Sequence, residues 1–247
     1  MTYLVHTAHA QLCALWAGCV GWTLTAVALG LIQWRVWQVS DREIITSGEA
    51  WVGLWRACFN SHSLVSPGFV ATHCQYIGLT EAFTPPEIVA GQVLMLLSLL
   101  VGLCGNAGGV YALRNIYFGM KTSPIRLLCV ITGGLSLLSA ATSLIPLLWN
   151  VSSVVTNQTI RFPPEFKMPP APDSQSVGFG IGVGVVGAVL MAVSGIVFCS
   201  YRLPVRSQLG ALPTLRHDVY LERSAGSGTL TDMRGRDNPA FESHEQL

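Results

Sequence analysis

Long apolar runs separated by short polar segments set the pattern of this chain. Four runs, residues 4–32, 88–113, 125–149 and 177–201, are interrupted by a single charged side chain, Arg126. A helix of roughly 20 apolar residues crosses about 30 Å of hydrocarbon, so each run predicts a membrane-spanning helix. The first run has no basic leader and no small-residue cleavage site, so we expect a span there and not a cleaved signal peptide.

Composition agrees with this membrane assignment. The chain is 51% hydrophobic and 11% charged, whereas an ordinary soluble domain carries about 25% charged residues. Its net charge of +1 gives no case for nucleic-acid binding, which needs a concentrated basic patch. Charged side chains in a bilayer are expensive and mark transport pathways, so their absence from the cores of the runs argues against proton-coupled transport.

Basic residues predict how the spans are oriented. Arg114, Lys121 and Arg126 flank the link between the second and third runs, and Arg202 and Arg206 follow the fourth. Because short cytoplasmic segments are rich in Lys and Arg, both termini are expected in the cytoplasm. The outer loops are then residues 33–87 and 150–176.

The first outer loop has the pattern of a small sheet. Segments 34–39, 44–46 and 51–57 are rich in β-branched and aromatic residues, and a charged turn lies between the first two. Such segments predict an antiparallel meander, and three or more strands with one buried face can be stable in water.

Two cysteines, Cys58 and Cys74, lie in this loop. Outside the cell the environment is oxidising, so the pair predicts a disulfide, which would add roughly 3 kcal/mol by constraining the unfolded chain. The alternatives are two free thiols or a metal site. The metal site is the weaker alternative, because a structural zinc site has four ligands and the histidines near the two cysteines are His62 and His73.

Three positions are candidates for covalent modification. Sequons for N-glycosylation begin at Asn150 and at Asn157 in the second outer loop. Asn150 abuts the end of a span, so Asn157 is the better candidate. Cys199, near the cytoplasmic face, is a candidate for palmitoylation, and apolar packing is the competing interpretation.

The segment 204–247 mixes Ser, Gly and both signs of charge with few apolar residues. This composition predicts a disordered cytoplasmic tail. Its end, Glu245-Gln246-Leu247, offers a carboxylate and an apolar residue that a PDZ scaffold domain could capture; a tail without such a partner is the alternative.

Catalysis has little support in the sequence. A nucleophile needs a base in reach and a group to orient that base, and the cluster Ser61-His62-Ser63 lacks them. We therefore expect no enzyme activity, no catalytic or metal-binding residue and no cofactor.

A more specific pattern spans the first outer loop. Trp34 opens it, Gly53-Leu54-Trp55 follows, and Cys58 and Cys74 come next. The tryptophans are also candidates for anchoring at the membrane surface. This pattern in a four-span protein resembles the signature of the claudin family. Other segments resemble the family too: Trp34-Arg35-Val36, residues 85–90 before the second span, and Ile145-Pro146 with Trp149 at the end of the third.

The resemblance covers residues 1–203. It implies a membrane α-helical fold, a four-helix bundle bearing a five-stranded antiparallel sheet, with four strands from the first outer loop and one from the second. It also implies a plasma-membrane protein at tight junctions, which associates with other claudins within one membrane and between cells to form or modulate the paracellular barrier. The alternative is an auxiliary subunit of a channel, or another non-junctional adhesion protein of the same superfamily.

Two positions depart from the family pattern. Gln92 stands where the family usually has an arginine, and Gln75 is neutral in a region where similar pore-forming members carry charge. The neutral Gln75 favours a barrier over a charge-selective pore.

Overall fold

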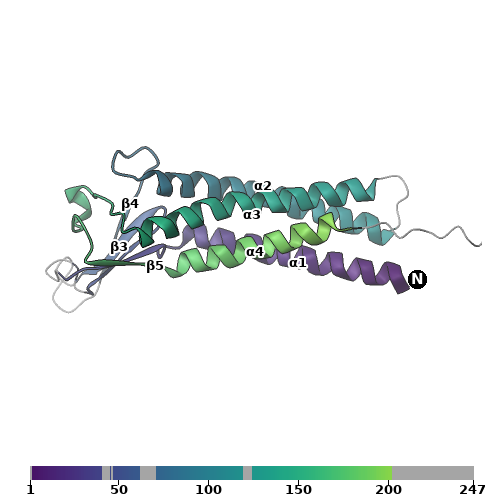
Figure 1. Cartoon of the computed structure of the whole chain (residues 1–247), viewed down its shortest axis with the longest axis horizontal. Helices are drawn as coiled ribbons and strands as arrows, with labels where there is room; N and C mark the ends of the chain where they lie inside the picture. The colour runs from purple at the N-terminus through teal and green to yellow at the C-terminus, as the bar shows by residue number, and fades with distance from the viewer. Residues whose placement is uncertain (1, 41–44, 46, 62–70, 119–123, 202–247) are drawn as a thin grey trace, which may run out of the picture. The chain divides into compact units, whose positions relative to one another are not determined.

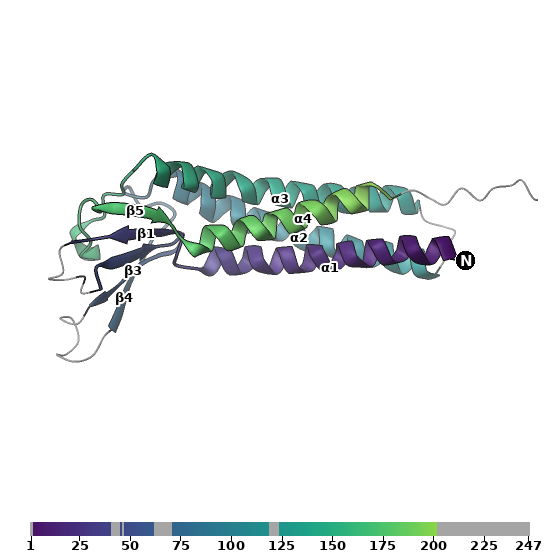
Figure 2. The ribbon, with the colours of Figure 1, turned by 60° about the horizontal axis from the view of Figure 1, so that its bottom comes forward.

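The computed structural model describes residues 2–40, 45, 47–61, 71–118 and 124–201. Within residues 1–204, one compact unit, four helices run side by side and a small sheet stands at one end of them (Figures 1 and 2). The N-terminus lies at the opposite end of the helices. The predicted tail, with Glu245, Gln246 and Leu247, lies outside the described residues.

Ten elements follow one another in the described parts of the chain. They are α1 (Thr2–Gly30), β1 (Arg35–Gln38), β2 (Glu49–Val52), β3 (Arg56–Ser61), β4 (Ala71–Tyr76), α2 (Pro86–Phe118), α3 (Ile125–Val155), the 3₁₀ turn η1 (Pro164–Phe166), β5 (Ser174–Val177) and α4 (Phe179–Cys199). The expected fold class, four helices with an antiparallel sheet, is confirmed.

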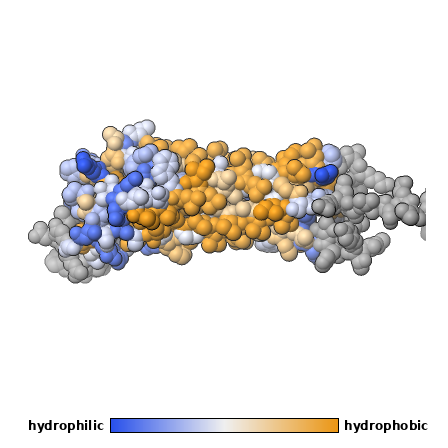
Figure 3. Space-filling view, viewed as in Figure 1, coloured by the Kyte–Doolittle hydropathy of each residue, from blue (hydrophilic) through white to orange (hydrophobic). Residues whose placement is uncertain are grey.

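The four helices carry an apolar surface. Residues 9–30, 86–117, 125–155 and 179–199 are long and apolar enough to cross a membrane. Figure 3 shows hydrophobic side chains over the length of the helices and hydrophilic ones gathered at the sheet end. The third helix is longer than its apolar run predicts, because it continues past Trp149 to Val155. Asn150 and Ser153 on this extension are buried by neighbouring protein.

The sheet is antiparallel, in the order β4-β3-β2-β1-β5. It differs from the sequence prediction in the segment 51–57, which was expected to form one strand. The structure divides this segment into the end of β2, a turn at residues 53–55 and the start of β3. The amide of Gly53 donates to the carbonyl of Arg56 (2.9 Å), which closes the turn. Gly53 also lies against the backbone of Ile32, which leaves no room for a side chain there.

Small and hydroxylated residues hold the helices together. The Ser98 hydroxyl donates to the Ser139 carbonyl, and the Ser139 hydroxyl lies equally close to the Ser98 carbonyl (both 2.7 Å), which joins α2 to α3. Between α1 and α4, a Cβ added to Gly21 would lie 2.6 Å from the Gly187 carbonyl oxygen. Within lipid, helix association depends on such close approach and on hydrogen bonds.

Candidate interaction site: the sheet and its mount on the helix ends

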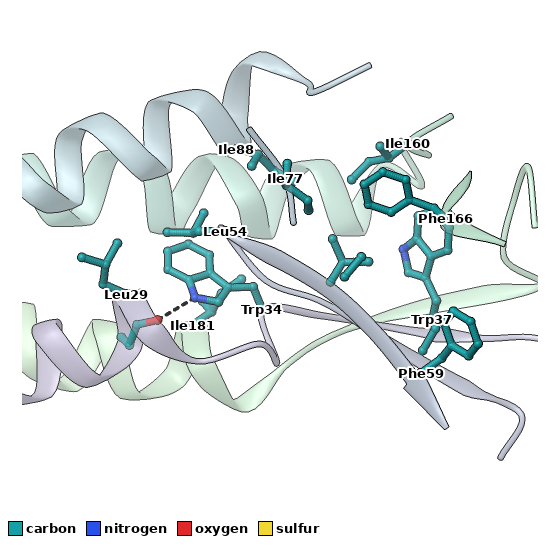
Figure 4. Close-up of a cluster of buried hydrophobic side chains, with 14 of the residues drawn as sticks. Leu29, Trp34, Trp37, Leu54, Phe59, Ile77, Ile88, Ile160, Phe166 and Ile181 are labelled. Carbon is teal, nitrogen blue, oxygen red and sulfur yellow. Dashed lines mark hydrogen bonds between the residues drawn. The ribbon is translucent and has the colours of Figure 1, made fainter. Parts of the chain in front are cut away.

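Trp34 joins the end of α1 to the start of the sheet. Its side chain is 1% exposed, and its indole Nε1 donates to the carbonyl oxygen of Ala28 near the end of α1 (2.7 Å). Figure 4 shows this bond, with the ring packed between Leu54 and Ile181. The interpretation of Trp34 as a membrane-surface anchor is therefore wrong, because its ring is buried within protein.

The turn Gly53-Leu54-Trp55 docks the sheet on the helices. A Cβ at Gly53 would lie 2.8 Å from the Cα of Ile32, so a side chain there would push the sheet away from the end of α1. Leu54 is buried and fills the space at Gly91 on α2, where an added Cβ would lie 2.5 Å from its Cδ2. The two glycines thus allow sheet and helices to approach closely.

Gln92 fixes the same turn with hydrogen bonds. Its Nε2 donates to the carbonyls of Leu54 (2.7 Å) and Ile77 (3.0 Å), so one buried amide on α2 holds both the β2–β3 turn and the residue after β4. An arginine is expected at this position from the family pattern. The glutamine supplies donors to the two carbonyls without placing a charge in the core.

Trp34, Leu54 and Gln92 hold the sheet on the ends of the helices, and we call this region the mount. Trp55 lies at its edge. Its ring is partly buried and stacks on Tyr76, with ring centroids 6.4 Å apart. The backbone beside it is also held, since the Trp55 carbonyl accepts from the Ile77 amide (2.8 Å). Of the two tryptophans of the motif, Trp55 is the one that remains near the surface.

A buried charged network joins β1 to two helices. Arg35 Nη2 contacts Glu87 Oε1 at 3.0 Å and Asn150 Oδ1 at 2.8 Å, and Arg35 Nε also donates to Asn150 Oδ1 (3.2 Å). The amide of Asn150 donates to the carbonyls of Glu87 and Pro146. Burial lowers the pKa of Arg35, and the hydrogen bond and charge of Glu87 act against that shift.

Sequence reasoning missed this network, because it considered Arg35 only as part of a family-like segment and Asn150 only as a glycosylation candidate. One signal was present. Alternate residues of a strand share a face, so Arg35 must lie on the same face as the apolar Trp37. The structure buries Arg35, Glu87 and Asn150 to 1%, 3% and 1% exposure.

The second loop packs against the sheet through aromatic side chains. The rings of Trp37 on β1 and Phe162 meet edge to face, with their centroids 5.4 Å apart, and the ring centroids of Phe83 and Phe166 are 5.1 Å apart. Ile160 and Phe166 are buried in the same cluster, and Figure 4 shows them beside Trp37. The phenylalanines of this loop therefore form part of the protein core.

Beyond this mount the sheet offers two outer strands. Cys58 and Cys74 are paired across β3 and β4 and form a disulfide, which fastens β4 at one side. At the other side, β5 pairs with β1 from Arg35 opposite Val177 to Gln38 opposite Ser174. The exposed Asp173 accepts from the Ser40 amide at 2.6 Å, and hydrogen bonding to the Ser40 side chain, then to this amide, lowers the pKa of Asp173.

The remaining predicted positions lie apart from the mount. Cys199 is partly exposed at the far end of α4, and Asn157 lies just after α3. Among the residues that the structure describes, no group of three or more His, Cys, Asp or Glu side chains is placed to hold a metal ion; His62 lies outside them.

Comparison with known proteins places this arrangement in a family. The protein-family model described as "PMP-22/EMP/MP20/Claudin tight junction" matches residues 19–200. The chain belongs to the claudin family. It is 26% identical to Claudin-3 of Canis lupus familiaris over 220 residues, which cover 88% of this chain and 93% of that protein. It is 25% identical to human Claudin-3 over 73% of this chain and 76% of that one. Mouse Claudin-2 is 24% identical, with 76% of each chain covered.

Proposed function

We propose that this chain is a plasma-membrane protein of tight junctions, which associates with itself or with other claudins through its sheet to form or modulate the paracellular barrier. The observation that carries the proposal is a sheet held by buried hydrogen bonds on an apolar four-helix bundle. In the described parts of the chain, its outer strands β4 and β5 each leave one side without a strand partner. Unpaired strand edges are templates for pairing with another chain.

The mount supports this role mechanically. Buried hydrogen bonds tie the sheet to three helices: Trp34 bonds to α1, Arg35 to Glu87 on α2 and Asn150 on α3, and Gln92 of α2 to the Leu54 carbonyl. A sheet held this way keeps one orientation relative to the helices. Contacts between the sheets of neighbouring molecules would then also fix how the helix bundles of those molecules are oriented in the bilayer.

The proposal includes an orientation, with both termini in the cytoplasm and the sheet outside. The basic residues Arg114 and Arg126 flank the link at the end of the helices away from the sheet, which is the cytoplasmic side by the positive-inside rule. Residues 204–247 would be a cytoplasmic tail, with Leu247 available to a PDZ scaffold and Cys199 to palmitoylation.

We infer a barrier in preference to a charge-selective pore. Gln75 on β4 contacts another side chain of the same strand, since its Nε2 lies 3.3 Å from Nε2 of His73. The amide has no net charge with which to select ions. This function requires binding between membrane proteins and no chemical reaction.

Expression in an epithelial line that lacks tight-junction strands tests the proposal. We expect enrichment at cell contacts, strands in freeze-fracture images and a higher transepithelial resistance, with little change in the ratio of cation to anion permeability. A uniform surface distribution with unchanged resistance would contradict it. Recovery of a stoichiometric channel with the purified protein, in the absence of strands, would instead support the auxiliary-subunit alternative.

A further inference from the structure

The second sequon lies in an accessible turn just after α3. The helix ends at Val155, and Asn157 follows with a positive φ of 52°. Its backbone amide donates to the Val154 carbonyl (3.1 Å), which fixes the turn, whereas Asn157 and Thr159 are both exposed. The asparagine and the hydroxyl residue that a sequon requires are therefore both open to an enzyme.

The first sequon has the opposite character. Asn150 is 1% exposed and lies within α3. Its Nδ2 donates to the Glu87 and Pro146 carbonyls, and its Oδ1 accepts from Arg35. Its amide nitrogen is occupied by structural bonds, so modification there would break the charged network of the mount.

Asn157 also lies beyond the hydrocarbon. The 31 residues of α3 give a helix about 46 Å long at 1.5 Å per residue, whereas the hydrocarbon of a bilayer is about 30 Å thick. The excess lies at the sheet end, because α3 continues there past its apolar run. A group attached to Asn157 would stand in water beside the sheet.

The neighbour of this sequon is an outer strand. Gln175 in the middle of β5 donates through Nε2 to the carbonyls of Val154 and Gln158 (3.3 Å each). The backbone on both sides of Asn157 is thus bonded to β5. On its outer side β5 has no strand partner among the described residues, so this edge is open to a group that stands on Asn157.

We propose that Asn157 carries an N-linked oligosaccharide, and that this glycan covers the β5 edge and leaves the β4 edge for contacts between copies. The proposal rests on the sidedness and sheet-mediated association proposed above. In the modification, the Asn157 amide nitrogen bonds to the anomeric carbon of an oligosaccharide carried on a lipid diphosphate. The bond from that carbon to the diphosphate oxygen breaks, and the lipid diphosphate leaves as the amide gives up one proton to a base of the transferase.

Covering one edge has a physical purpose. A sheet with two open edges can add strands at both sides, and proteins commonly block such edges to prevent uncontrolled pairing. A hydrated glycan beside β5 excludes an approaching strand by its volume. The disulfide between Cys58 and Cys74 holds the opposite strand, β4, in place for pairing.

The modification is tested on the full chain in mammalian cells by its gel mobility before and after a glycosidase that removes N-linked glycans. We expect a shift of one glycan, which Thr159→Ala abolishes and Thr159→Ser retains. Ser152→Ala removes the first sequon while leaving the Asn150 side chain in place, and should change nothing. A shift that survives Thr159→Ala, or that Ser152→Ala removes, would overturn the assignment.

A designed sequon separates this proposal from the sidedness on which it rests. Gly78→Asn, with Leu79 and Thr80, creates an acceptor in the first outer loop. A glycan on this site with none at Asn157 would overturn the inference alone. Glycans on neither site would overturn the orientation as well, with surface labelling used to show that the variant is made and reaches the membrane.

Edge coverage is tested by cross-linking with a bis-maleimide that does not cross membranes. Ser176→Cys on β5 should give few cross-linked dimers when Thr159 is present and more with Thr159→Ala, whereas Thr159→Ser should behave as the parent. Thr72→Cys, exposed on β4, should cross-link equally in all three backgrounds. Equal Ser176→Cys cross-linking with and without the glycan would overturn the shielding role.

Discussion

At the scale of single residues, two charged side chains, Arg35 and Glu87, are buried and help to hold the sheet on the helices. In an ordinary loop such side chains would be hydrated. Arg35 lies within hydrogen-bond distance of Glu87 and Asn150, and all three side chains are buried. A buried pair adds little net stability by itself, but removal of one partner leaves an uncompensated charge and costs about 3–5 kcal/mol. The network therefore makes the position of β1 sensitive to any of its members.

Glu87→Gln tests this network. We expect a clear fall in the midpoint of thermal unfolding in detergent, because the Arg35 charge loses its counter-charge. Labelling of the buried Cys129 by a thiol-reactive dye reports the unfolding. The exposed Glu81→Gln is the matched control and should leave the midpoint unchanged. Equal midpoints for the two variants would contradict a structural role for the pair.

Gln92→Leu tests the second tie of the mount. The substitution keeps much of the side-chain volume but removes both donors, which leaves the carbonyls of Leu54 and Ile77 unpaired by this residue. A buried polar group without a partner costs about 1–3 kcal/mol. The same unfolding measurement should show destabilisation, and cleavage of the sheet region by a protease should become faster. Unchanged proteolysis would show that other contacts suffice to hold the turn.

At the scale of elements, the helices depend on positions without side chains. An added Cβ at Gly187 of α4 would lie 2.8 Å from the backbone oxygen of Gly21 and 3.0 Å from the backbone nitrogen of Thr25 on α1. Backbone atoms cannot rotate away, so the two helices would have to separate. Gly182 on the same helix has nothing within 4 Å of its added Cβ.

Gly187→Ala and Gly182→Ala therefore form a matched pair. The first should destabilise the bundle by about 1–3 kcal/mol, the usual cost of overpacking. The second should be neutral or slightly stabilising, because alanine favours helix over glycine. Thermal unfolding in one detergent measures both. A loss of stability for Gly182→Ala as large as that for Gly187→Ala would mean that helix contacts do not explain the glycines.

At the scale of the whole molecule, two parts have separable roles, since the bundle is held by helix packing and the sheet edge by a disulfide. Replacement of Cys58 and Cys74 together by alanine removes a cross-link worth roughly 3 kcal/mol at strand β4. We expect helical circular dichroism to persist while enrichment at cell contacts and the gain in transepithelial resistance are lost. Alanine at the exposed Cys104 is the control. Full barrier activity without the disulfide would contradict a role for β4 in association.

By itself, the sequence determined the four spans, because runs of apolar residues have one stable place beside lipid. It also predicted a sheet, because several strand-forming segments lie in one loop. It predicted the pairing of Cys58 with Cys74, because both cysteines lie in that loop. These are properties of local composition and of compartment, which need no knowledge of distant contacts.

The tertiary structure alone decided what the individual residues do. It placed Trp34 in the core and Asn150 in a charged network, turned Gly53-Leu54-Trp55 away from strand geometry, and left Asn157 exposed. Several of the deciding contacts join residues far apart in the sequence: Gln92 bonds to Ile77, 15 positions away, and Arg35 bonds to Asn150, 115 positions away. Strand alternation could show which face Arg35 shares, but its hydrogen-bond partners are set by the meeting of distant segments, which no local pattern encodes.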